Sequence, residues 1–260
     1  MSENKPIYVS LTSIFQKQDV LLETLRSMLV QTVMPTKIFL FLSKNPYLLD
    51  SGFPNKQITN TYLKHFLEKH SYIINVIWVG NKGPYRKLIP ILRKKWTEDC
   101  IIITIDDDTV YDNRLIENLV NDYKKHNCVI NYRGFTPKID KIDKLKYVKT
   151  SFFKNKCLYN FPTGKGGVLY TPAFFHKTHN LIFNKDIYLN KCKTADDVWF
   201  MLVRVANNVE CYLDNNKPFM KKDNNCNALS LFGNYNNKNN KNTQQIQETI
   251  QRLKEMQYFL

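Results

Sequence analysis

The chain has 260 residues, of which 43% are hydrophobic and 13% aromatic, and it contains only 8 glycines. This composition provides enough apolar surface for one large folded domain and excludes a collagen-like or intrinsically disordered chain. With 38 basic and 23 acidic residues the formal net charge is +15, which favours anionic partners such as nucleotides, nucleic acids or acidic lipid headgroups. No apolar run in the sequence approaches the roughly 20 residues that a membrane-spanning helix needs.

The first half of the sequence alternates predicted strands with predicted helices. Apolar runs predict strands at 6–13, 37–42, 73–79, 100–105 and 128–132. The helices between them are expected from Asp19 as N-cap, at 57–70, at 85–96 with a bend at Pro90, and after Asp112 as N-cap. This alternation is typical of a doubly wound sheet with helices on both faces.

After Arg133 the alternation of elements is lost. Residues 134–160 are rich in lysine and follow no clear helix or strand period. Further on, Thr194 is the predicted N-cap of a helix with an apolar face, and 209–213 is a predicted strand.

The end of the chain combines a polar segment with a helix. Asparagine and lysine dominate residues 221–243, which predicts loop-like structure. A final amphipathic helix is predicted from Asn242, with Gln245 as its capping-box partner.

The cysteines and the amino terminus predict a cytoplasmic location. The six cysteines are scattered and include no Cys-x-x-Cys pair, so we interpret them as reduced thiols. Residues 1–6 lack the apolar segment of a secretory signal peptide. The positive charge is compatible with peripheral contact between this cytoplasmic protein and an anionic membrane.

Three consecutive carboxylates, Asp106, Asp107 and Asp108, follow the apolar strand predicted at 100–105. In open α/β sheets, ligands bind beyond the carboxyl ends of the strands. Adjacent carboxylates repel one another, so their ionisation calls for a cation. Oxygen ligands suit Mg²⁺ or Mn²⁺, which proteins often share with substrate phosphates. The alternative is a turn in which aspartate side chains accept backbone hydrogen bonds.

A glycine-rich stretch and a second acidic pair are further candidates. In Gly164-Lys165-Gly166-Gly167 the glycines permit close approach of the backbone to a ligand, or form a tight turn or bulge before a strand. The spacing matches neither a Rossmann nor a Walker A motif. Asp196 and Asp197 begin a predicted helix, where the helix dipole alone would favour acids. One of the two could instead face the crevice as a general base.

Single basic residues and histidines complete the candidates. Lys87 and Arg86 follow the third predicted strand and could contact a pyrophosphate, or belong to a solvated basic face. His176 or His179 could supply a metal ligand, or be an ordinary surface or core histidine.

These stretches together resemble the GT-A-fold glycosyltransferases, in particular small bacterial and viral enzymes that build surface polysaccharide or lipopolysaccharide. The resemblance runs from about residue 6 to about residue 205 and is carried by the stretches 9–13, 31–32, 85–90, 103–108, 161–170 and 195–200. It implies one GT-A (Rossmann-like) α/β domain with a mixed, mostly parallel sheet and helices on both faces. That domain would span 1–220 and consist of a nucleotide-binding half (1–133) and an acceptor half (134–220). A loop and an amphipathic helix (221–260) would follow it.

The resemblance also implies an activity and roles for residues. A monosaccharide would pass from a UDP- or GDP-linked donor to a hydroxyl of a glycan or glycolipid, and no nucleic acid is involved. Asp197 would be the base of an inverting reaction, and Asp196 would orient the acceptor or Asp197 itself. Mn²⁺ or Mg²⁺ would be held by Asp108 and Asp106, with His176 as a further candidate ligand. The implied donor-binding residues are Thr12, Lys87, Asp106, Asp107, Gly166 and Gly167.

Two other functions use the same features. A metal-dependent phosphoryl or nucleotidyl transferase also needs clustered acids and would bind nucleic acid with steep salt dependence, although the sequence contains no recognisable nucleic-acid module. A non-catalytic basic adaptor would dock on an anionic polymer or membrane and would show no metal-dependent affinity for UDP or GDP. Neither alternative explains why the acid triplet, the glycines and the acidic pair occur together in this order.

Overall fold

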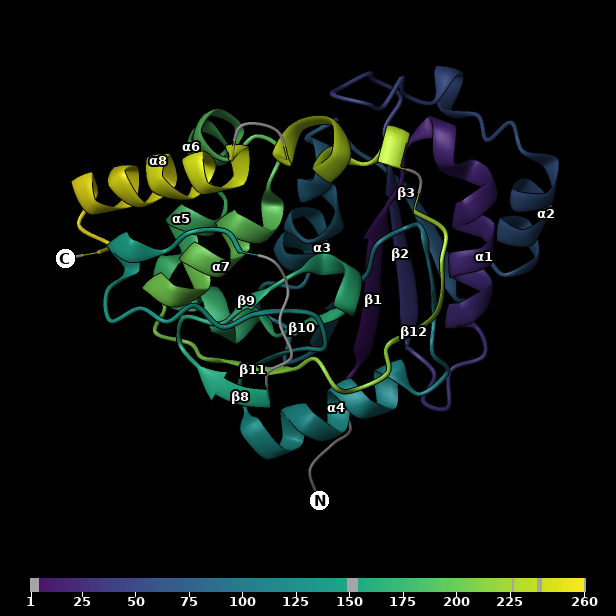
Figure 1. Ribbon diagram of the computed structural model, residues 1–260. Helices are drawn as coiled ribbons and strands as arrows, with labels where there is room; N and C mark the ends of the chain where they lie inside the picture. The colour runs from purple at the N-terminus through teal and green to yellow at the C-terminus, as the bar shows by residue number, and fades with distance from the viewer. Residues whose placement is uncertain (1–4, 149–153, 226, 238–239, 260) are drawn as a thin grey trace.

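The computed structural model describes residues 5–148, 154–225, 227–237 and 240–259. A mixed sheet of eight strands runs through its centre (Figure 1). In sheet order the strands are β3 (Ile74–Trp78), β2 (Lys37–Leu42), β1 (Ile7–Thr12), β4 (Ile101–Thr104), β10 (Val168–Tyr170), β6 (Val129–Asn131), β11 (Cys211–Asp214) and β8 (Lys154–Cys157). Neighbours from β3 to β4 are parallel, as are β6 and β11. Strand β10 is antiparallel to both of its neighbours.

Helices cover both faces of this sheet because its strands are apolar on both sides. In β4, Ile102 belongs to one core, whereas Ile101 and Ile103 belong to the other. The helices on the side of Ile101 are α1 (Gln18–Met28), α2 (Thr61–Lys69) and α4 (Leu115–His126). The helices on the side of Ile102 are α3 (Ile89–Lys94), α5 (His179–Ile182), α6 (Lys185–Lys191), α7 (Asp196–Ala206) and α8 (Lys241–Glu255). The predicted α/β class is confirmed.

The strand predictions were accurate, and the helix starts were less so. All six predicted strands are present, each with ends within two residues of the prediction. Helix α2 begins later than predicted, because Asn60 caps it by accepting a hydrogen bond from the Leu63 N–H at 2.7 Å. The helix predicted at 85–96 is divided into a 3₁₀ turn (Gly83–Lys87) and α3. Pro90 lies in the first turn of α3, so it starts that helix instead of bending a longer one.

The predicted N-caps were wrong in several places. Asp112 accepts a hydrogen bond from the Arg114 N–H at 2.9 Å in the turn before α4, whose N-cap position is Arg114. Thr194 precedes the N-cap position of α7, and its hydroxyl contacts the Gln245 side chain at 3.1 Å. Asp19 lies inside the first turn of α1. These short polar side chains are used in turns and tertiary contacts, which compete with capping.

The C-terminal segment contains regular structure where a loop was predicted. Strand β12 (Met220–Asp223) pairs antiparallel with β5 (Thr109–Tyr111), the strand that directly follows the acid triplet. A short ribbon of β7 (Gly134–Phe135) and β9 (Phe161–Pro162) lies elsewhere in the second half. Beyond β12 the chain forms short helical turns at Asn227–Leu229 and Phe232–Asn236. Residues 220–223 are therefore paired with a strand that lies next to the acid triplet.

Helix α8 is part of the main fold. Its residues Ile246, Ile250 and Leu253 are buried in the same core as Trp199 of α7. Gln245, predicted as a capping residue, accepts a hydrogen bond from the Thr194 N–H at 3.0 Å and links α8 to the start of α7. In the part of the chain that the structure describes, no helix has both the length and the apolar character to cross a membrane. The described cysteines are free thiols, and Cys226 lies outside the described residues.

Candidate active site

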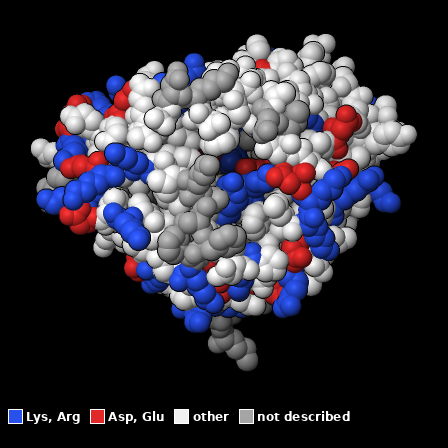
Figure 2. Space-filling view, viewed as in Figure 1, with Lys and Arg blue, Asp and Glu red and all other residues white. Residues whose placement is uncertain are grey.

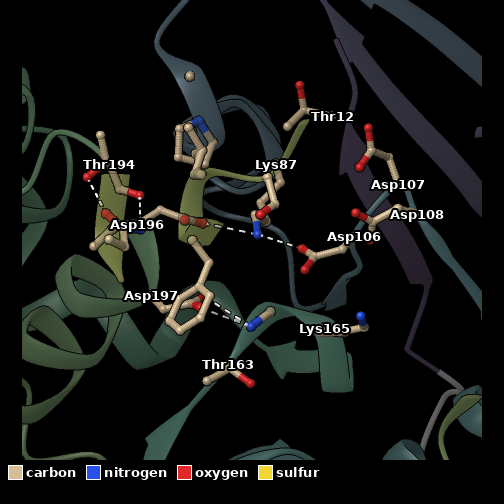
Figure 3. A pocket seen from close by; sticks show the side chains of 18 of the residues that line it. Thr12, Lys87, Asp106, Asp107, Asp108, Thr163, Lys165, Thr194, Asp196 and Asp197 are labelled. Carbon is tan, nitrogen blue, oxygen red and sulfur yellow. Dashed lines mark hydrogen bonds and ion pairs between the residues drawn. The ribbon is translucent and has the colours of Figure 1, made fainter. Parts of the chain in front are cut away.

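The acid triplet and the glycine-rich stretch meet at one edge of the sheet. Because β10 is antiparallel to β4, with Val168 opposite Thr104, its first residues lie beside the carboxyl end of β4. The turn at Gly164–Gly166 is thereby brought next to Asp106. A pocket of about 760 Å³ opens at this edge. The residues that line it include Lys17 and Gly164. Figure 3 labels others, among them Thr12, Lys87, Lys165 and the acids 106–108, 196 and 197.

Two of the three consecutive acids are bound to Lys17. Its ammonium lies 2.8 Å from Asp108 Oδ2 and 3.3 Å from Asp107 Oδ1. Asp107 is held further by the Ser13 hydroxyl, which donates to its Oδ2 at 2.5 Å. Burial, and next the charge of Asp107, raise the pKa of Asp108. Asp107 is thus an anchored residue, whereas Asp108 carries an unfavourable charge.

Lys87 connects the acid triplet with the second acidic pair. Its ammonium lies 2.8 Å from Asp106 Oδ1 and 3.2 Å from Asp196 Oδ2. Burial lowers the pKa of Lys87, but attraction to Asp106 and Asp196 outweighs burial and holds that pKa well above its usual value. For Asp106 the attraction of Lys87 likewise outweighs burial, so the pKa of Asp106 is lowered. This lysine stays charged in the middle of the pocket.

Asp197 differs from the other acids in its proton affinity. Both of its carboxylate oxygens accept a hydrogen bond from the Gly164 N–H, at 3.1 and 3.2 Å. Burial, followed by the negative charge of Asp196, raises the pKa of Asp197 to about 7. Burial also raises the pKa of Asp196. Asp197 is partly exposed to the pocket, and a carboxylate with a pKa near neutrality has the proton affinity required of a general base.

Gly164 lies against the ends of three charged side chains. A Cβ atom at this position would lie 2.7 Å from Lys87 Nζ, 2.9 Å from Asp106 Oδ1 and 3.4 Å from Asp197 Oδ1. The absence of a Cβ therefore allows these three groups to surround one backbone position.

The other two predicted glycines play structural roles. Gly166 packs against the Arg133 backbone, where a Cβ would come within 2.6 Å of the Arg133 nitrogen. Gly167 has a φ of +70° and accepts a hydrogen bond from the Asn131 side chain at 2.8 Å. Neither is among the residues that line the pocket, whereas Gly164 and Lys165 are. For Gly166 and Gly167 the structure supports the alternative of a tight turn before a strand.

The structure also locates the remaining predicted residues. Thr12 lines the pocket, but its hydroxyl donates to the Phe41 carbonyl at 2.7 Å. Arg86 is buried and its guanidinium lies 2.9 Å from Asp50 Oδ2. His176 is not brought to the pocket, since its ring packs on Trp96 and its Nε2 lies 3.0 Å from the Trp96 carbonyl oxygen. We therefore leave His176 out of the proposed metal site.

Sequence reasoning missed Lys17 and the C-terminal wall of the pocket. Lys17 lies at the end of the 3₁₀ turn after β1. Its position just after the first predicted strand, and so near the edge of the sheet, was the one sequence feature that could have indicated it. The pocket wall includes Leu229, Leu231 and Phe232. These belong to residues 224–237, in which the sequence has no charged side chain. Figure 2 shows acidic and basic side chains together in the hollow at the centre of this face, with uncharged surface above them.

The described residues contain no group of three or more histidine, cysteine, aspartate or glutamate side chains arranged to hold a metal ion. A divalent cation at the acid triplet would take protein oxygens from Asp108 and Asp106 and its other ligands from elsewhere. Mg²⁺ commonly binds in this way, through one or two carboxylates plus substrate phosphates and water. The Lys17 ammonium beside Asp107 and Asp108 shows that this position attracts a cation.

Comparison with known proteins gives structural matches alone. No protein-family model and no curated protein matches the sequence. Residues 1–349 of S. aureus TarS, a GT-A glycosyltransferase, superpose with a TM-score of 0.55 at 14% identity, over 82% of this chain and 59% of that one. The protein has the GT-A fold. The expected fold is thereby confirmed.

Other structures with this fold have been solved with nucleotides. TarS 1–349 with UDP matches at a TM-score of 0.55 and 13% identity, over 82% of this chain and 59% of that one. The Pyrobaculum calidifontis mannosyltransferase PcManGT, in complex with GDP-Man and Mn²⁺, matches at a TM-score of 0.54 and 12% identity. The match covers 85% of this chain and 57% of that one. The chain thus spans less than two thirds of the length of these GT-A structures.

Proposed function

We propose that the protein is a glycosyltransferase that moves a monosaccharide from a nucleotide-sugar to a hydroxyl of a glycan or glycolipid. One observation carries the proposal: a carboxylate with a raised pKa, Asp197, shares one pocket with a charged lysine, Lys87, and the acid triplet. The GT-A fold supports it, since PcManGT binds GDP-Man with Mn²⁺ and TarS binds UDP and UDP-GlcNAc.

Asp197 is the proposed base. As the acceptor hydroxyl attacks the anomeric carbon, Asp197 takes its proton, the new C–O bond forms, and the bond from that carbon to the nucleoside diphosphate breaks. In Figure 3, Asp197 and the acid triplet lie on different sides of the open space. We propose inversion, because a base and a leaving group on opposite sides of the sugar suit a single displacement. Asp196, held by Lys87 at 3.2 Å, raises the proton affinity of Asp197 by its charge.

The charge balance of the pocket supports a need for a cation with the donor. Five carboxylates (106–108, 196 and 197) face three basic side chains, Lys17, Lys87 and Arg133. The other two basic side chains of the pocket are paired elsewhere, Lys165 with Asp223 and Arg86 with Asp50. A diphosphate would add more negative charge, which is unfavourable without compensation. We propose that Asp108 and Asp106 would hold Mn²⁺ or Mg²⁺. When bound, such an ion neutralises charge on the leaving diphosphate.

The C-terminal wall is the proposed acceptor side. Phe232 is 47% exposed, and its ring lies 6.4 Å from that of Tyr147, which also lines the pocket. Aromatic faces next to amide side chains suit the apolar faces and hydroxyls of a sugar. Because residues 224–237 are uncharged, we propose that the part of the acceptor bound here is a neutral sugar.

The proposed contact with an anionic membrane involves a different surface. Lys138, Lys141 and Lys146 are exposed on the segment that follows β7. Clustered exposed lysines near a membrane surface each add favourable electrostatic energy. Cosedimentation with vesicles containing acidic lipids would detect this contact, and an unchanged distribution on adding such vesicles would contradict it.

The test of the proposed function is a thermal-shift panel of UDP, GDP, ADP and CMP, each with and without Mn²⁺. A ligand that binds only the folded protein raises its melting temperature. We expect a metal-dependent rise with UDP or GDP, and release of free sugar when the matching nucleotide-sugar is added. Binding of nucleic acid with steep salt dependence would favour a nucleotidyl transferase. No shift with any nucleotide would favour a basic adaptor.

A further inference from the structure

Lys17 occupies the side of the acid triplet at which a divalent cation would bind. It lies at the end of the 3₁₀ turn that follows β1, and only about 10% of its side chain is exposed. The ammonium contacts Asp108 Oδ2 at 2.8 Å and Asp107 Oδ1 at 3.3 Å. A cation supplied by the chain is therefore already bound between two of the three acids.

The two acids depend on Lys17 to different degrees. Asp107 also accepts a hydrogen bond from the Ser13 hydroxyl at 2.5 Å, and its backbone carbonyl accepts one from the Thr24 hydroxyl at 2.9 Å. For the Asp108 carboxylate, Lys17 is the one hydrogen-bond partner among the described residues. If the ammonium moved away, Asp107 would stay anchored and Asp108 would be left with an uncompensated buried charge. Asp108 is thus the acid that an incoming metal ion would take.

We propose that the Lys17 ammonium holds the cation position in the free protein, so that a divalent metal binds together with the nucleotide diphosphate and only weakly without it. The proposal depends on the proposed function for the identity of the nucleotide. Two cations within a few ångströms of each other repel strongly in a partly buried site, so the metal must displace the ammonium. Without a diphosphate the displaced ammonium has no new anionic partner, and the described residues offer the metal no group of three histidine, cysteine, aspartate or glutamate ligands.

A bound diphosphate supplies both what the metal lacks and what the displaced ammonium lacks. Its oxygens supply the ligands that the protein lacks, and they also accept the ammonium that leaves Asp108. Metal and nucleotide then favour each other's binding by the same factor, as linkage requires. Lys17 is in this sense a positioning residue, because its ammonium balances the negative charge of the acid triplet until the donor binds.

The first experiment measures Mn²⁺ binding to the full chain without nucleotide, by electron paramagnetic resonance of free Mn²⁺. We expect Lys17→Met to bind Mn²⁺ roughly ten-fold or more tightly than the wild type, because the competing cation is removed. Lys17→Arg keeps the charge and should bind as weakly as the wild type. Lys165→Met is the matched control, because Lys165 lines the same pocket but is paired with Asp223. Equal Mn²⁺ affinity of Lys17→Met and the wild type would overturn the proposal.

The main measurement of a second experiment uses the wild type alone and does not depend on the folding of a variant. In the wild type, the apparent Mn²⁺ affinity is measured with and without saturating UDP or GDP, whichever raises the melting temperature. We expect the nucleotide to raise the Mn²⁺ affinity, and Lys17→Met to reduce this coupling. A wild type that binds Mn²⁺ equally well with and without the nucleotide contradicts the proposal even though the proposed function stands. If no nucleotide binds, the proposed function fails, and the nucleotide-free comparison still decides the role of Lys17.

Discussion

Both carboxylate oxygens of Asp197 accept a hydrogen bond from the backbone N–H of Gly164, at 3.1 and 3.2 Å. The α-carbon of the same glycine faces Lys87 and Asp106, whose side-chain ends a methyl group would displace. One backbone position therefore fixes the proposed base relative to the proposed phosphate-binding lysine. A change at Gly164 should affect both parts of the site, whereas a change at Asp197 should affect the base alone.

Substitution of Gly164 by alanine should disrupt donor binding. The new Cβ would lie 2.7 Å from Lys87 Nζ and 2.9 Å from Asp106 Oδ1, so it would displace the ends of both side chains and disturb their ion pair. We expect a lower melting temperature and a weaker UDP or GDP affinity by calorimetry. Gly80→Ala is the matched control, because no atom lies within 4 Å of a Cβ at that position. Wild-type nucleotide affinity in Gly164→Ala would show that the Lys87–Asp106 pair does not contact the donor.

Substitution of Asp197 by asparagine should remove the base and leave the donor site intact. We expect turnover to fall by roughly 10²-fold or more, the usual contribution of a general base. Nucleotide affinity should stay near the wild-type value, because Lys87 and Asp106 keep their 2.8 Å contact. Steady-state kinetics and calorimetry on the same preparation separate the two effects. Full activity of Asp197→Asn would refute the assignment of the base.

The position of the acid triplet could be predicted because it depends only on the strand that precedes it in sequence. A buried apolar strand that ends in Asp106 places its acids at the carboxyl edge of a parallel sheet. The fold followed from the same alternation of elements, and all six predicted strands are present. Lys87 and the acids of the two acidic motifs line the pocket as predicted, whereas the predicted Gly166, Gly167 and His176 do not.

The contacts within the site could not be predicted in this way. Lys17 and Asp107 are 90 residues apart in sequence, and no local pattern pairs them. Which glycine faces the pocket depends on the path of the turn. Gly166 was therefore assigned to the site from the sequence, whereas Gly164 is the glycine that lines the pocket. Thr194 and Asp112 carry good capping side chains, yet tertiary partners and turn geometry decide where α7 and α4 begin.

The pH dependence of activity should report the ionisation of Asp197. Burial, and then the charge of Asp196, raise the pKa of Asp197 to about 7, and a base is active when it is deprotonated. We therefore expect kcat/KM to rise with pH, with a midpoint near pH 7 and a plateau above about pH 8. In Asp196→Asn the neighbouring charge is removed, so the midpoint of this rise should move to lower pH. A wild-type rise centred near pH 4, the value of an ordinary carboxyl, would argue against Asp197 as the base.

Phe232 should matter for the acceptor and not for the donor. Its exposed ring forms part of the uncharged wall of the pocket, and loss of an aromatic contact is worth about 0.5–1.5 kcal/mol. We expect Phe232→Ala to raise the KM for the acceptor by about two- to ten-fold and to leave nucleotide affinity unchanged. Tyr235→Ala is a suitable comparison, because Tyr235 belongs to the same segment but does not line this pocket. A weaker nucleotide affinity in Phe232→Ala alone would assign this wall to the donor instead.

The raised pKa of Asp197 also predicts that removal of its charge stabilises the protein. In the unfolded chain an aspartate titrates near pH 3.9, whereas in the fold Asp197 does so at about 7, so its ionisation opposes folding at high pH. The stabilisation of Asp197→Asn should be absent below about pH 4, grow between pH 4 and 7, and stay constant above. We expect about 1–2 kcal/mol at pH 9, less than the full shift implies because the group is partly exposed. Urea unfolding at pH 5 and pH 9 measures this, with Asp99→Asn as the comparison at an exposed aspartate. A destabilised Asp197→Asn at pH 9 would mean that the Gly164 hydrogen bonds outweigh the cost of burying the charge.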